Sequence, residues 1–103
     1  MEIEREMARR LVKEFHPEQI ILFGSYARGT AGPDSDIDLL VVMSVSGSKR
    51  KTTVAMYSLL GGMGIPKDII LVTPEEVQKY QKIPGTVVYQ ALSEGKVLYE
   101  RAA

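Results

Sequence analysis

The sequence predicts an α/β domain in which helices pack against a small β-sheet. Helical patterns alternate with short apolar runs along the chain, as in layered α/β proteins. The apolar runs are rich in β-branched residues and are bounded by turn residues, which favours strands. The 103 residues suffice for one domain, and we expect residues 1–103 to form a single domain.

The composition excludes several classes of protein. The 13 Lys and Arg residues balance 13 Asp and Glu residues, which weighs against direct binding of nucleic acid. The chain has no cysteine and one histidine, His16, so disulfides, thiolate metal sites and clusters of histidine ligands are excluded. We see neither a membrane-spanning run nor a signal peptide, so we expect a cytoplasmic protein with no membrane partner.

The first third of the chain predicts a helix, a strand and a turn. Residues 2–15 form an amphipathic helix, which Pro17 ends because the residue before a proline disfavours the α region. Its apolar stripe recurs every four residues, at Ile3, Met7, Leu11 and Phe15. Residues 20–23 predict a strand buried on both faces. One helical turn follows at 26–28, and residues 30–35 have the composition of a loop.

The remainder predicts three further strands, the last of them at an edge of the sheet. Residues 37–43 and 68–72 are apolar runs that each begin beside a carboxylate, and 96–99 predict the edge strand. Between the first two strands, residues 49–60 predict a helix. We expect its apolar stripe to contain Val54, Tyr57 and Leu60.

Two more helices are predicted between residue 73 and Gly95. Thr73 is the N-cap of the first, Pro74 takes its first position and Glu76 completes a capping box. We expect this helix to carry Val77, Tyr80 and Ile83 and to end at Pro84-Gly85. The second is short and carries the apolar residues Val87, Val88, Ala91 and Leu92.

Two carboxylates stand at the entrance of the second strand. Strand side chains alternate, so Asp36 and Asp38 point the same way, about 7 Å apart along the chain. Oxygen ligands of this kind suit Mg²⁺ or Mn²⁺, which take their remaining ligands from water and substrate phosphates. Asp68 joins them if its strand is the neighbour, and three carboxylates are suited to two ions that assist an in-line displacement.

A small-residue turn, Gly24-Ser25, ends the first strand. Glycine lets the backbone approach a ligand closely, and amides at the start of a helical turn favour an anion such as phosphate. Either signal alone is weak, since the turn could be plain and the carboxylates merely solvated. Together they predict a site for a nucleoside triphosphate.

Three neighbouring features have two interpretations each. Arg28 could bind a phosphate bidentately or pair with Asp34 or Asp36, and the sequence leaves both open. Tyr26 is as compatible with core packing as with contact to a nucleobase. The basic residues 49–51 could contact triphosphate or a partner, but a solvated face is favoured.

Gly24-Ser25, ten intervening residues and Asp36-Ile37-Asp38 resemble the signature of the nucleotidyltransferase superfamily related to DNA polymerase β. The strings Gly-Ser-Tyr-Ala-Arg-Gly and Ser-Asp-Ile-Asp-Leu resemble the minimal nucleotidyltransferases of prokaryotes. The resemblance implies a mixed sheet with helices packed against it. It also implies that Asp36 and Asp38 bind the metals that carry ATP, that Asp68 is the third carboxylate, and that Gly24 and Ser25 hold the phosphates.

Similar proteins work as antitoxins with a HEPN-domain toxin, and can transfer AMP from ATP to a tyrosine of that toxin. We therefore expect a metal-dependent enzyme with two Mg²⁺ or Mn²⁺ ions. One alternative is a module that binds nucleotide and occludes its partner without catalysis. Another is an enzyme that modifies a small molecule such as an aminoglycoside, although such enzymes usually carry an added helical domain. Because one small domain leaves the acceptor side open, we expect a partner chain or a homo-oligomer to complete the site.

Overall fold

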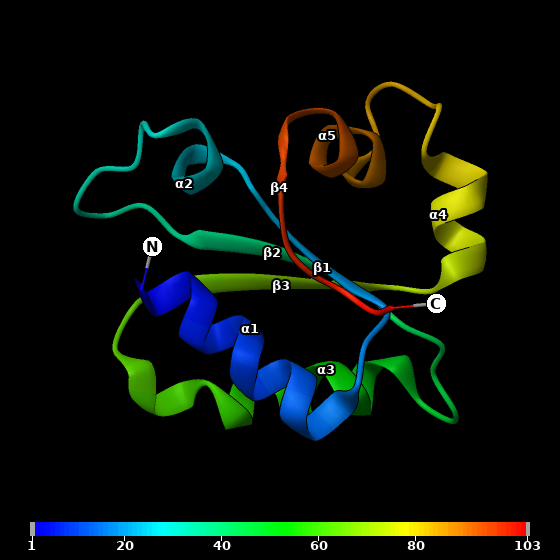
Figure 1. Ribbon diagram of the computed structural model, residues 1–103, viewed down its shortest axis with the longest axis horizontal. Helices are drawn as coiled ribbons and strands as arrows, with labels where there is room; N and C mark the ends of the chain where they lie inside the picture. Colours follow the sequence, from blue (N-terminus) through cyan, green and yellow to red (C-terminus); the bar gives the residue numbers. More distant parts are fainter. Residues whose placement is uncertain (1, 103) are drawn as a thin grey trace.

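A four-stranded mixed sheet lies between two layers of helices in the computed structural model, which describes residues 2–102 (Figure 1). The strands are β1 (Gln19–Phe23), β2 (Ile37–Val42), β3 (Lys67–Val72) and β4 (Lys96–Glu100). The helices are α1 (Glu2–Phe15), α2 (Ser25–Arg28), α3 (Lys49–Leu59), α4 (Pro74–Tyr80) and α5 (Val87–Glu94), with a 3₁₀ turn η1 (Gly61–Met63). Helices α1 and α3 lie on one side of the sheet, and α4 and α5 lie on the other. The predicted fold class is confirmed.

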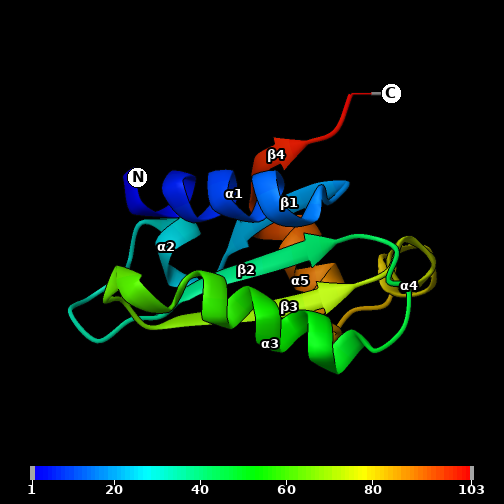
Figure 2. The ribbon, with the colours of Figure 1, turned by 90° about the horizontal axis from the view of Figure 1, so that it is seen from below.

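The strand order is β3-β2-β1-β4. Strand β1 is antiparallel to both of its neighbours, whereas β2 and β3 run parallel and are joined by a crossover through α3 (Figure 2). As a result, the end of β1 and the beginnings of β2 and β3 meet at one end of the sheet. In the register of these strands, Phe23 is opposite Asp38 on one side, and Asp68 is opposite Asp38 on the other.

Each face of the sheet has its own apolar core, because side chains alternate along every strand. The first core joins α1 and α3 to the sheet through Met7, Leu11, Leu22, Leu39, Leu71, Met56 and Leu60, among others. The second core joins α5 to the sheet through Ile21, Phe23, Leu40, Val42, Val72, Val88 and Ala91. Five of the six residues of β2 are therefore buried, alternating between the two cores. Four of the five residues of β1 are buried as well, which confirms the prediction that residues 20–23 form a strand buried on both faces.

Most predicted elements are found, including the Thr73 capping box and the edge position of β4. Two predictions were wrong. Helix α4 ends at Tyr80, because the amide of Ile83 bonds to the Tyr80 carbonyl in a turn before Pro84, and the side chain of Ile83 is exposed. In α3, Val54 faces solvent and Met56 joins Leu60 in the core, since residues four apart share a helix face.

Candidate active site

The predicted carboxylates gather where β2 and β3 begin. Asp38 and Asp68 each occupy the second position of their strand and are direct neighbours in the parallel register. Leu40 and Ile70, two residues further along each strand, pack in the second core, so both carboxylates lie on the face that carries α4 and α5. This confirms the condition on which the third carboxylate depended.

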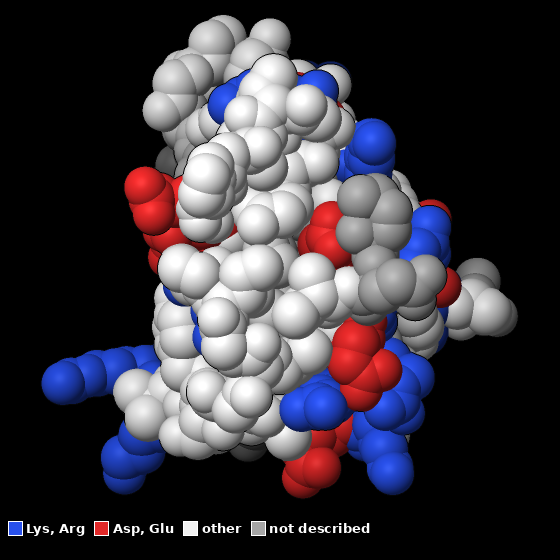
Figure 3. Space-filling model, turned by 90° about the vertical axis from the view of Figure 1, so that its left-hand side faces the viewer, with Lys and Arg blue, Asp and Glu red and all other residues white. Residues whose placement is uncertain are grey.

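Asp36 differs from the prediction in one respect. It lies one residue before β2 and is exposed, because the strand begins at Ile37, whose amide bonds to the Pro66 carbonyl. Its charge still reaches Asp38. Figure 3 looks onto this end of the molecule and shows acidic groups at several places on the face, with Lys and Arg side chains around them.

Crowding of negative charge is visible at Asp38. Partial burial, followed by the charges of Asp68 and Asp36, raises the pKa of this carboxyl above its usual range, and the Arg28 guanidinium opposes the rise. An ionised Asp38 is therefore held at a cost in free energy. A cation at this place would relieve that cost.

Gly24 belongs to the same structural unit as Asp38. A Cβ atom at Gly24 would lie 2.2 Å from Oδ2 of Asp38, so any other residue at this position would force the carboxylate to move. Gly24 also has φ 75° and ψ −155°, a conformation that is essentially restricted to glycine. The Gly24 turn therefore lies in contact with the Asp38 side chain at the beginning of β2. Ser25, half-buried, is the first residue of α2.

Arg28 pairs with a residue that the sequence did not suggest. Its guanidinium donates to Glu94 of α5 at 3.0 Å, where we had considered Asp34 or Asp36 as structural partners. Glu94 also accepts from Gln90, and these two donors lower the pKa of Glu94, with the Gln90 hydrogen bond the larger cause. The last turn of α2 is thus tied to the end of α5.

Tyr57 of α3 is a site residue that the sequence analysis missed. Its hydroxyl donates to Oδ1 of Asp68 at 3.2 Å and accepts from the Ile69 amide at 2.8 Å. The sequence pattern predicted only that Tyr57 faces the core, which its ring does. Nothing in the sequence indicates that its hydroxyl reaches the edge strand.

The remaining candidates have structural roles here. Tyr26 is half-buried and packs against the first core, as one of its two interpretations proposed. Lys49 bonds to Glu76 at 2.8 Å, and Arg50 and Lys51 are exposed, in agreement with a solvated face.

All three predicted metal ligands offer oxygen atoms, the donors that Mg²⁺ and Mn²⁺ prefer. Among the described residues 2–102, no group of three or more His, Cys, Asp or Glu side chains is placed so that it could hold a metal ion. The space that Gly24 leaves for the Asp38 carboxylate, and the pairing of Asp38 with Asp68, suit an ion that takes its other ligands from water and phosphate.

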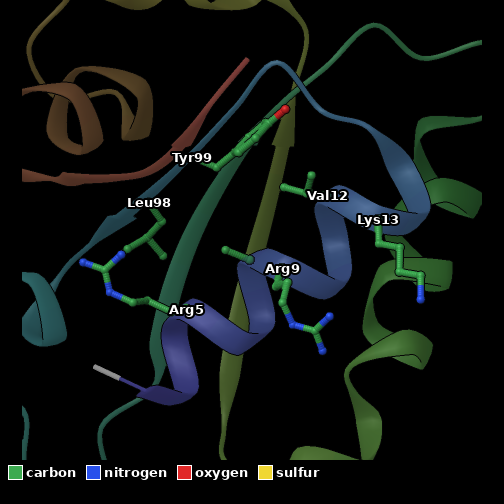
Figure 4. A pocket seen from close by; sticks show the side chains of 7 residues that line it. Arg5, Arg9, Val12, Lys13, Leu98 and Tyr99 are labelled. Atoms are coloured by element: carbon green, nitrogen blue, oxygen red, sulfur yellow. The ribbon is translucent and has the colours of Figure 1, made fainter. Parts of the chain in front are cut away.

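A groove elsewhere on the molecule is not part of this site. It has a volume of about 360 Å³ and lies between α1 and β4, on the opposite face of the sheet (Figure 4). Its floor is apolar and is formed by Ala8, Val12, Leu98 and Tyr99, and its rim is basic and is formed by Arg5, Arg9 and Lys13.

Within residues 2–102, no helix has both the length and the apolar character needed to cross a membrane.

The motif that resembles the nucleotidyltransferase signature thus comes together in space, with its glycine turn against a pair of carboxylates on neighbouring strands. Residues 5–103 match the family described as polymerase beta, nucleotidyltransferase, and the chain belongs to this family. The resemblance seen in the motif is thereby confirmed over nearly the whole chain.

One curated relative agrees with this family, and two solved structures have a similar fold. The chain is 38% identical over 82 residues to a proposed protein adenylyltransferase of Methanocaldococcus jannaschii, covering 80% of this chain and 78% of the relative. Its fold is similar to a chain in a crystal structure of a toxin–antitoxin with AMP-PNP (TM-score 0.66, 22% identity, covering 94% of this chain and 73% of the other). It is also similar to a chain in the complex of a tri-AMPylated Shewanella oneidensis HEPN toxin with an MNT antitoxin (TM-score 0.59, 17% identity, covering 97% and 72%).

Proposed function

We propose that this nucleotidyltransferase transfers AMP from ATP to a hydroxyl group of a partner protein, with release of pyrophosphate. The acceptor that we propose is a tyrosine of a HEPN-type toxin, and the protein then acts as the antitoxin. The observation that carries the proposal is the juxtaposition of Asp38, Asp68 and Gly24 at one end of the sheet. The relative named as a protein adenylyltransferase and the toxin–antitoxin structures support the choice of acceptor.

In this proposal Asp36, Asp38 and Asp68 hold two divalent ions, Mg²⁺ or Mn²⁺. The ions would supply positive charge to the triphosphate and to the attacking hydroxyl. The raised pKa of Asp38 fits this role, because a carboxylate that is unfavourable alone gains most from a bound cation. Gly24 gives the carboxylate its space, and we propose that Ser25, the first residue of α2, donates its hydroxyl to a phosphate oxygen.

Arg28 has a second part in the proposal. Its ion pair with Glu94 is about half exposed on the Arg28 side, so the guanidinium can exchange this partner at little cost. We propose that Arg28 contacts the triphosphate when nucleotide binds. The acceptor hydroxyl would enter from the open side of the carboxylates, from a partner chain or a second copy of this chain.

Transfer of label tests the proposal. The purified protein is incubated with ATP labelled at the α-phosphate, Mg²⁺ or Mn²⁺ and the product of a neighbouring gene as candidate partner, and the labelled peptide is located by mass spectrometry. We expect AMP on a tyrosine of that partner. Chelation of the metal with EDTA should abolish the label, and excess Mg²⁺ should restore it.

The matched variants are the double substitution Asp36→Asn with Asp38→Asn and the single substitution Asp34→Asn. The double variant should lose labelling and keep its circular dichroism spectrum and cooperative unfolding. The loop variant should label normally, because Asp34 is an exposed residue of the loop before β2 and is not one of the proposed ligands. Full labelling by the double variant would contradict the assignment of the site. Calorimetry that detects no binding of ATP with Mg²⁺ would favour a non-catalytic module instead.

A further inference from the structure

Tyr57 connects the first core, between the sheet and helices α1 and α3, to the carboxylate site. It comes from α3, where its ring packs against the first core. Its hydroxyl reaches β3, which is the last strand on its side of the sheet. There it makes two hydrogen bonds, with the Ile69 amide at 2.8 Å and with Asp68 Oδ1 at 3.2 Å.

These two bonds fix the direction of the phenolic proton. A tyrosine hydroxyl has one proton to donate, and an amide can only donate to it. Because the Ile69 amide takes a lone pair of the oxygen, the proton is left for the Asp68 carboxylate. A strand at the edge of a sheet has backbone groups that no neighbouring strand satisfies, and Tyr57 supplies the acceptor for one of them.

Asp68 needs such an anchor. Its side chain is exposed, and it lies beside Asp38 in the register, so repulsion between the two carboxylates favours rotamers that move Asp68 away. The Tyr57 bond engages Oδ1 only, which leaves Oδ2 free to serve as a ligand.

We propose that Tyr57 is a positioning residue of the nucleotidyl-transfer site, whose hydroxyl fixes the orientation of the Asp68 carboxylate, on the strand next to Asp38, for binding a divalent ion. The inference rests on the proposed function, since it assigns Asp68 to the metal site. Tyr57 touches neither the nucleotide nor the ion in this role. It acts through Asp68, as partners that orient metal ligands do in other proteins.

The test measures metal affinity directly. Mn²⁺ is titrated by electron paramagnetic resonance into the protein with a non-hydrolysable ATP analogue. Tyr57→Phe keeps the packed ring and removes the hydroxyl, and we expect it to weaken Mn²⁺ binding at the affected site by about tenfold or more. With ATP and the partner, kcat should fall by a similar factor, while KM for ATP changes less than about twofold. Tyr89→Phe, an exposed tyrosine of α5, is the matched control and should change neither quantity.

A double-mutant cycle separates positioning from a general structural effect. If Tyr57 acts through Asp68, then Tyr57→Phe should not weaken Mn²⁺ binding further in a protein that already carries Asp68→Asn. Equal Mn²⁺ affinities of wild type and Tyr57→Phe would overturn the inference, and so would losses that add in the double variant. Should Tyr57→Phe fail to fold, O-methyltyrosine at position 57 retains the acceptor oxygen for Ile69 without the proton. The same loss of affinity is expected, and unchanged affinity again overturns the inference.

The proposed function can fail in a way that is recognisable in the same experiment. In that case the wild-type protein itself binds no Mn²⁺ with the analogue and labels no partner, and both proposals are overturned together. If wild type binds Mn²⁺ and labels its partner while the Tyr57 variants match it, only the positioning role is overturned.

Discussion

The two faces of the sheet are built from the same strands, but one is buried throughout and the other carries the carboxylate site. The face under α1 and α3 is dry along its whole length, with Ile37, Leu39 and Val41 of β2 all fully buried. The other face is dry only toward the end of β2, where Leu40 and Val42 pack with α5, and it begins with Asp38. One strand therefore anchors the fold through one set of alternate residues and presents the site through the other.

This arrangement makes the site rigid without burying it. The backbone of Asp38 is held on both sides by β1 and β3, and the residues before and after it lie in the first core. The carboxylate itself is only partly covered. The carboxylate that we propose as a metal ligand is thus fixed by neighbours that are apolar.

Substitutions at two neighbouring residues of β2, one on each face, should differ most in their effect on the free energy of unfolding. Leu39→Ala removes a fully buried side chain from the first core and should lower the free energy of unfolding by about 2–5 kcal/mol. Asp38→Asn should leave stability unchanged or raise it, because it removes a carboxylate whose charge is unfavourable in the folded protein. Urea unfolding measures both. A large loss of stability in Asp38→Asn would mean that this carboxylate supports the fold as well as the site.

We call the face under α1 and α3 the closed face, and the face that begins with Asp38 the open face. Gly24→Ala should disturb the carboxylate site of the open face and leave the packing of the closed face unchanged. The added Cβ would collide with Asp38 Oδ2, and the backbone conformation is strained for any other residue, which costs roughly 1–3 kcal/mol of stability. Displacement of Asp38 by about an ångström should reduce AMP transfer by about 100-fold.

Gly29→Ala is the control for the Gly24 substitution. Gly29 also has a positive φ, 76°, but open space surrounds its Cβ position. It should therefore lose about 1–2 kcal/mol of stability from the left-handed conformation alone and keep its transfer rate once folded. Equal losses of activity in the two variants would show that backbone strain, and not the contact with Asp38, is responsible.

The closed face could be predicted from the sequence almost completely. Its evidence is local, since the stripe of α1 and the apolar run of β2 state which residues are buried before any neighbour is known. The error on this face is at Val54 of α3, an apolar residue that lies off the buried stripe of its helix, and the error at Ile83 lies on the opposite side, past the end of α4. There, three-dimensional packing decides burial, and local pattern does not.

The open face could be predicted only in part. Asp38 and Gly24 are recognisable from spacing, but their contact depends on the pairing of β1 with β2, which spacing does not reveal. The bonds of Tyr57 to Asp68 and of Arg28 to Glu94 join residues from different elements. Such pairs leave no periodic signal in one sequence.

The pH dependence of Asp38 gives a finer test of the open face. Its folded-state pKa is raised above the unfolded value of about 3.9, so the folded protein binds this proton more tightly. Stability linked to Asp38 is therefore fully present below the unfolded pKa and is lost as pH rises through the folded pKa. We expect Asp38→Asn to be more stable than wild type at neutral pH in metal-free buffer, and this advantage to vanish toward pH of about 4. An advantage that grows as pH falls would contradict the sign of the shift.

Glu6, on the outer surface of α1, should show the smallest effect and the opposite sign. Hydrogen bonds from Arg9 and then Arg10 lower its pKa from 4.5 to about 2, so the folded protein binds this proton less tightly than the unfolded chain. The stability it contributes is present above pH 4.5 and is lost as pH falls through about 2. Wild type should therefore be slightly more stable than Glu6→Gln at pH 6 and equally stable near pH 2. Added salt should reduce the difference in stability, because the ion pairs of Glu6 with Arg9 and Arg10 are solvated. Thermal unfolding across this pH range measures the difference. A difference in stability that is insensitive to salt and as large as that of Leu39→Ala would contradict this prediction. Glu6 would then contribute to the apolar core under α1, and not only to the solvated surface of the helix.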